Sequence, residues 1–173
     1  MKISLKFPVL FLLILAGFCL RPGISSIAPL AETLQRQFYD VGATGIGLLT
    51  SIPVVCMGVI SPLAFLLEKR VGLKQTLMIG LVLVFFGELL RWFDSWFGLM
   101  LLTAVLVGVG DALIRPMISG FIKLRCADRG RLAVSVYAAS MGAGAGAATL
   151  STASLADISG HPGGGLVFWA LPT

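Results

Sequence analysis

The residue with the clearest chemical meaning is Arg21, because its guanidinium interrupts an apolar run from Phe7 to Ala31 that is long enough to cross a bilayer. A charge at that depth costs at least about 2.5 kcal/mol and must be compensated. Ser25 follows one helical turn later, on the same face. A guanidinium fork beside a hydroxyl donor suits a small planar oxyanion. Arg21 therefore indicates a polar route through a membrane, although snorkelling or a structural ion pair would also accommodate it.

A second set of charges lies in another apolar run. Asp111 and Arg115 are four residues apart, so they share one helix face and can neutralise each other. Alternatively, Asp111 engages Arg21 in one conformation and Arg115 in another, as a switchable partner. Both interpretations stay open. The predicted solute-binding residues are Arg21, Ser25, Asp111 and Arg115.

The remaining polar residues give weaker signals. Glu88 lies one turn before the outer end of the third apolar run, near Arg91, and is predicted to be interfacial rather than part of a proton relay. The single histidine, His161, stands in a Gly/Pro-rich segment, with no zinc-ligand spacing and no nucleophile elbow. The three cysteines are isolated from one another. We therefore expect no enzyme, no cofactor and no metal site.

Composition places these residues in a membrane protein. Of 173 residues, 57% are hydrophobic and 12% are charged, whereas a soluble domain carries about 25% charged residues. This predicts an all-α protein of the lipid bilayer. The predicted spans are 7–31, 41–67, 75–93, 97–124 and 132–156. A sixth apolar segment starts at Leu166 and stops at Thr173, so we expect a sixth helix that is cut short.

Two features of the spans indicate packing and orientation. Gly142 and Gly146 in the fifth span have the spacing that lets two helices approach closely, so this span is predicted to be a packing helix. Basic residues gather on one side of the membrane, which predicts a cytoplasmic N-terminus in a cell membrane, most simply a bacterial inner membrane. That side carries Lys2, Lys6, Lys69, Arg70, Lys74, Lys123, Arg125, Arg129 and Arg131, against Arg36 and Arg91 on the other. The net charge of +5 thus comes from basic residues that set the orientation in the membrane, and it indicates no nucleic-acid partner.

Six segments, in order along nearly the whole chain, carry a family resemblance. The most specific are GFCLRPGISSIAPL and GIGLLTSIPVVCMGVISPL, and RVGLKQ, GELLRW, GVGDALIRPMISGFIK and FWALP follow them. Together they resemble the cyanate and nitroimidazole porter branch of the major facilitator superfamily. The resemblance implies a secondary transporter of two six-helix halves that moves small anionic or planar polar solutes. By that analogy, residues 1–173 are the N-terminal half.

The resemblance extends to individual residues. Arg21 and Pro22 match the family's Arg-Pro in helix one, which faces the central cavity, and Ile122 and Lys123 match the Ile-Lys that ends helix four. The loop signature of the superfamily persists only as EKRVGLK, without its Asp. Four further positions depart from the pattern: Cys19 replaces a common Asn, Ser119 replaces a Pro, and Asp111 and Arg115 replace residues that are usually uncharged.

A half-transporter supplies half a site, so activity requires a partner. The candidates are a C-terminal half and a second copy of the chain in parallel orientation. The alternative function, from another class, is a transport-inactive truncated membrane protein that only packs against other helices.

Overall fold

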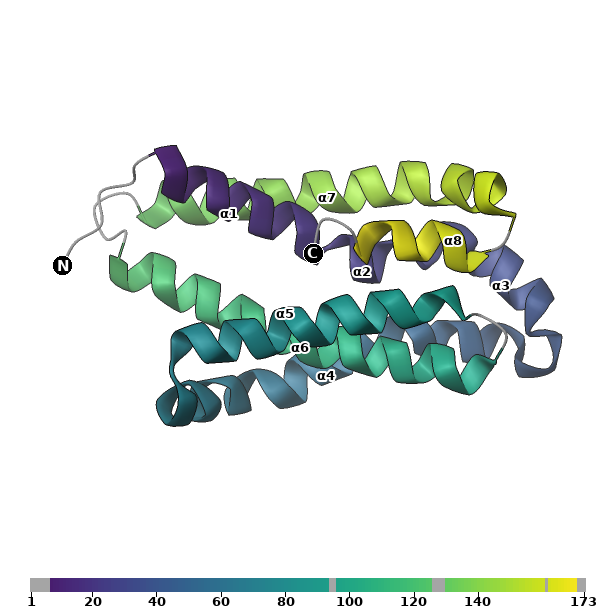
Figure 1. Cartoon of the computed structure of the whole chain (residues 1–173), viewed down its shortest axis with the longest axis horizontal. Helices are drawn as coiled ribbons and strands as arrows, with labels where there is room; N and C mark the ends of the chain where they lie inside the picture. The colour runs from purple at the N-terminus through teal and green to yellow at the C-terminus, as the bar shows by residue number, and fades with distance from the viewer. Residues whose placement is uncertain (1–6, 94–95, 126–129, 161, 171–173) are drawn as a thin grey trace.

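The computed structural model describes residues 7–93, 96–125, 130–160 and 162–170, which form helices and no strand (Figure 1). Five helical stretches are long and apolar enough to cross a membrane, as predicted. Helices suit this setting because every backbone donor and acceptor must be satisfied within the segment. The five stretches are Phe11–Gln37, Thr44–Val71, Leu73–Trp92, Phe97–Ile122 and Gly130–Ser159.

The first membrane segment is broken rather than continuous. It consists of α1 (Phe7–Leu20), α2 (Pro22–Ser25), a 3-10 turn (Ala28–Leu30) and α3 (Ala31–Gln37). Proline lacks a backbone N–H and crowds the preceding turn, so prolines at positions 22 and 29 interrupt the helical hydrogen bonds. The segment extends to Gln37 instead of ending at residue 31, and Arg21 lies at the break between α1 and α2.

The next three long helices follow with short connections. They are α4 (Gly42–Val71), α5 (Leu73–Leu89) and α6 (Phe97–Arg125), with 3-10 turns at Tyr39–Val41 and Leu90–Trp92. Gly72 alone separates α4 from α5, and its φ of 88° lies in the region that favours glycine. The α4–α5 connection is consequently a one-residue turn.

The fifth span is α7 (Gly130–Ser159), followed by α8 (Pro162–Val167) and a last 3-10 turn, Phe168–Ala170. The sixth helical segment thus begins at Pro162 and not at Leu166, and the proline takes the first helical position, where its missing N–H is tolerated. His161 lies outside the described residues. Trp169 Nε1 donates to Thr152 Oγ1 at 3.1 Å, which ties the end of this segment to α7.

The helices form two groups (Figure 1). One consists of α1 lying along α7, and the other of α6 packed against both α4 and α5. The short α2 contacts α7 and α6, and α8 contacts α7 and the 3-10 turn after α5, so these short elements join the groups. The start of α1, the α4–α5 turn and the end of α6 lie at one end of the molecule.

Small residues set how closely α1 and α7 approach, but they are not the predicted ones. A Cβ on Gly144 would overlap the carbonyl oxygen of Phe18, so α7 touches the α1 backbone there. A Cβ on Gly142 or on Gly146 would have no atom of another element within 4 Å. The prediction that these two glycines bring another helix of the chain close to the fifth span was therefore wrong for the described residues. The buried face of α7 repeats about every four residues, through Ser140, Gly144, Ala148, Thr152 and Ala156.

Candidate functional site

The predicted Asp111–Arg115 pair exists on α6. Arg115 Nε donates to Asp111 Oδ1 at 2.7 Å, and Arg115 Nη2 lies 2.6 Å from Asp111 Oδ2. The Asp111 side chain is fully buried, whereas that of Arg115 is 21% exposed. The self-neutralised arrangement is therefore the one present in this structure, with both carboxylate oxygens facing one guanidinium.

Arg21 stands at the break in the first segment, partly buried. Its backbone carbonyl accepts from the Ile24 amide at 3.2 Å and from the Ser25 amide at 3.1 Å, which starts α2 one turn along. Within the described part of the chain, its guanidinium has no ion-pair partner within 4.0 Å. The charge of Arg21 nevertheless attracts the Asp111 carboxylate at longer range. Arg21 is therefore close to the charge pair without belonging to it.

Two serines follow Arg21 with available hydroxyls. Ser25 is partly buried, and its hydroxyl makes no hydrogen bond to a described residue. Ser26 is fully buried, and its Oγ also has no partner among those residues. Serine in a membrane helix commonly bonds the carbonyl one turn back, and neither does so here. The break thus presents one guanidinium and two hydroxyls that make no side-chain hydrogen bond to the described residues.

Tyr137 on α7 also belongs to this region, and sequence reasoning missed it. It is 6% exposed, and its hydroxyl has no hydrogen-bond partner among the described residues. The charges of Arg115 and Asp111 both act on the phenol, which places it near that pair. The available signal was a phenol within an apolar span, since buried tyrosine hydroxyls usually find a partner.

Glu88 and Arg91 are placed differently from the prediction. They are 0% and 1% exposed, so Glu88 faces the interior of the bundle instead of an exposed surface at the interface. Arg91 Nη1 donates to the carbonyl oxygen of Gly23 at 2.6 Å. Hydropathy indicates how far along a span a residue lies but not which way it faces. Here Glu88 at the end of α5 and Arg91 in the following 3-10 turn both face the break in the first segment.

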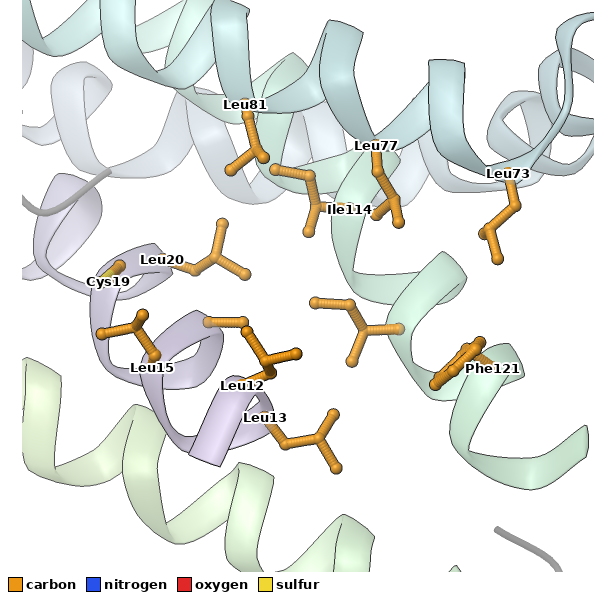
Figure 2. A pocket seen from close by; sticks show the side chains of 12 residues that line it. Leu12, Leu13, Leu15, Cys19, Leu20, Leu73, Leu77, Leu81, Ile114 and Phe121 are labelled. Carbon is orange, nitrogen blue, oxygen red and sulfur yellow. The ribbon is translucent and has the colours of Figure 1, made fainter. Parts of the chain in front are cut away.

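An apolar groove lies beside these polar residues and is distinct from them (Figure 2). Its volume is about 430 Å³, and it runs between α1, α5 and α6. Leucine, isoleucine and phenylalanine side chains dominate its walls, among them Leu20, Leu77, Ile114 and Phe121. None of the predicted solute-binding residues lines it, and its chemistry does not suit an anion.

Comparison with known proteins gives a consistent result. The family model described as the Major Facilitator Superfamily matches residues 13–172. The chain is 32% identical to the cyanate transport protein CynX of Escherichia coli (strain K12) over 164 residues, which is 95% of the chain and 42% of CynX. It is 33% identical to the 2-nitroimidazole transporter of the same organism over 126 residues, 73% of the chain and 32% of that protein.

A third relative is the uncharacterized transporter YycB of Bacillus subtilis (strain 168), 33% identical over 129 residues, 75% of the chain and 32% of YycB. The chain thus spans 32% to 42% of the length of these curated relatives. No solved structure matches the chain significantly.

Proposed function

The chain belongs to the major facilitator superfamily, and from that premise we propose that it supplies the N-terminal half of a secondary transporter for a small anionic or planar polar solute, with Arg21 as a solute-binding residue. The observation that carries the proposal is the state of two arginines in the apolar bundle. Arg115 is paired with Asp111, whereas Arg21 has no such partner among the described residues. An unpaired guanidinium at this depth is costly, and a bound anion would offset that cost.

The neighbouring hydroxyls support the same ligand class. An anion held by the Arg21 fork would accept further hydrogen bonds from Ser25 Oγ, and Ser26 Oγ is a second available donor. Arg suits this task better than Lys, because its planar fork presents two parallel N–H donors to a planar anion.

Asp111 gives the site a means of switching. Arg115 holds the carboxylate in this structure, and Arg21 attracts it from farther away. When no anion is bound, movement of Asp111 toward Arg21 would neutralise Arg21 and release Arg115. An anion bound to Arg21 would neutralise it instead and leave Asp111 with Arg115. The solute would therefore favour the conformation in which Asp111 pairs with Arg115.

Exposed glycines on α4 support packing of a partner half. Gly47 and Gly58 on α4 are exposed, and a Cβ added at either would meet no atom of another element within 4 Å. Small residues on exposed helix faces permit close packing of another helix in a membrane. We propose a C-terminal half as the partner, with a second parallel copy as the other possibility, and the solute site between the two.

The proposed setting is a bacterial inner membrane with the N-terminus in the cytoplasm. Lys69, Arg70 and Lys74 surround the α4–α5 turn, at the same end as the start of α1 and the end of α6. The exposed aromatic side chains Trp92 and Trp96 lie near the opposite end, where they suit a membrane–water interface.

The test is binding of isotopically labelled cyanate to the chain in lipid nanodiscs, with uptake measured when a C-terminal half is co-expressed. Arg21→Lys should weaken binding by roughly tenfold to a hundredfold, because it removes one of two charge-assisted hydrogen bonds. The matched control is Arg36→Lys, since Arg36 is exposed and its Nη2 lies 2.6 Å from Glu32 Oε1. Equal binding by both variants would refute the role of Arg21, and absence of binding and uptake in the wild type would favour the transport-inactive alternative.

A further inference from the structure

The buried pair Glu88 and Arg91 is not used by the proposed site, yet it contacts the segment that carries Arg21. The two residues are 0% and 1% exposed, at the end of α5 and in the following 3-10 turn. The negative charge of Glu88 attracts the Arg91 guanidinium. A buried pair of this kind is weak evidence of stability, because desolvation offsets the attraction. We therefore ask what else these two buried residues do.

Arg91 donates a hydrogen bond to a backbone carbonyl at the break in the first segment. The amides of Ile24 and Ser25 donate to the Arg21 carbonyl, and the Ser26 amide donates to that of Pro22. The backbone hydrogen bonds of α2 end with that bond. The next carbonyl, that of Gly23, accepts instead from Arg91 Nη1 at 2.6 Å. Arg91 thus satisfies a buried backbone oxygen that the break leaves without its helical donor.

Glu88 fixes how closely the two elements approach. A Cβ on Gly23 would overlap the Glu88 Oε1 atom and would lie 3.1 Å from Val107 Cγ1 of α6. Gly23 therefore lets the first segment rest directly on the α5–α6 surface. The Arg91–Gly23 hydrogen bond and this close contact join the first segment to the group formed by α4, α5 and α6.

We propose that Glu88 and Arg91 are positioning residues for Arg21. By holding the Gly23 carbonyl two residues beyond Arg21, they fix where the first segment changes course and hence where the Arg21 guanidinium lies relative to Asp111. A binding group must be held by supporting contacts to within about 0.5 Å to keep a productive geometry. This inference rests on the proposed function, in which Arg21 binds the solute.

The experiment uses the full chain in nanodiscs, with Cys19, Cys56 and Cys126 replaced by Ala. Spin labels at Phe11→Cys on α1 and Val82→Cys on α5 report the distance between the elements that the pair joins, and both sites are exposed. The test variant is Glu88→Gln with Arg91→Met, which keeps the buried site neutral while removing the donor to Gly23. The distance distribution should be narrow in the parent and clearly broader or shifted in this variant.

Two further variants sharpen the result. Arg91→Lys keeps a charged donor near the Gly23 carbonyl, so its distance distribution should be nearly as narrow as that of the parent. If Arg91 only filled space, the variants with Lys and with Met at this position would give the same distribution. Arg36→Met removes an exposed arginine of the same first segment and should leave the distribution unchanged. Cyanate binding is measured on the same samples and should weaken by about tenfold or more in the double variant only.

The outcomes separate this inference from the proposed function. An unchanged distance distribution in the double variant overturns the inference, and so does a broadened distribution with unaltered cyanate binding. If the parent chain binds no cyanate, the proposed function fails, and the distance measurement alone decides whether the pair fixes the first segment.

Discussion

Replacing Asp111 with Asn tests the buried charge pair of α6. Removing one member of a buried ion pair costs about 3–5 kcal/mol, because the other charge is left without compensation. Arg115 is 21% exposed, so water screens part of its charge, and the asparagine carbonyl keeps one acceptor for Nε. We therefore expect a loss of about 2–3 kcal/mol in the free energy of unfolding. Tryptophan fluorescence during titration with sodium dodecyl sulfate measures this loss.

Two controls make the Asp111 result specific. Asp157→Asn changes an exposed carboxylate on α7 and should leave the free energy of unfolding unaltered. The double variant Asp111→Asn, Arg115→Gln removes both charges and should return to within about 1 kcal/mol of the parent. If Asp111→Asn is as stable as Asp157→Asn, the pair does not compensate charge in the bundle, and the reasoning from burial is refuted.

Two other predictions concern packing and orientation. Gly144→Leu should lower the free energy of unfolding by about 1–3 kcal/mol, because a side chain there meets the Phe18 carbonyl. Gly146→Leu should leave the free energy of unfolding unchanged. Equal losses of stability in the two variants would contradict the observed contact between α1 and α7. A maleimide that cannot cross membranes should label Asp40→Cys but not Lys69→Cys in intact cells, and the reverse pattern would overturn the proposed cytoplasmic N-terminus.

The spans were predictable because the bilayer imposes length and hydropathy on a helix regardless of its neighbours. The Asp111–Arg115 pair was predictable for a similar reason, since it depends only on helical spacing within α6. Pro22 indicated a bend in the first segment, but not its course through α2 and α3 to Gln37. That course depends on contacts with other helices.

The wrong predictions share one physical cause. Glu88 was expected at an interface, and Gly142 and Gly146 were expected to pack, because sequence gives depth and spacing along a helix. Which face is buried depends on the rotation of each helix about its axis, and tertiary contacts set that rotation. Tyr137 was missed for the same reason, since its importance comes from the charges that α6 brings near it.

The most direct test of the account is whether a bound anion touches the Arg21 guanidinium. Solid-state NMR dephasing between ¹³C-labelled cyanate and ¹⁵N-labelled arginine side chains, in the chain in nanodiscs, measures that proximity. The account predicts dephasing that disappears in Arg21→Lys and persists in Arg115→Lys and Arg36→Lys. Dephasing that survives in Arg21→Lys, or that is lost only in Arg115→Lys, would contradict it.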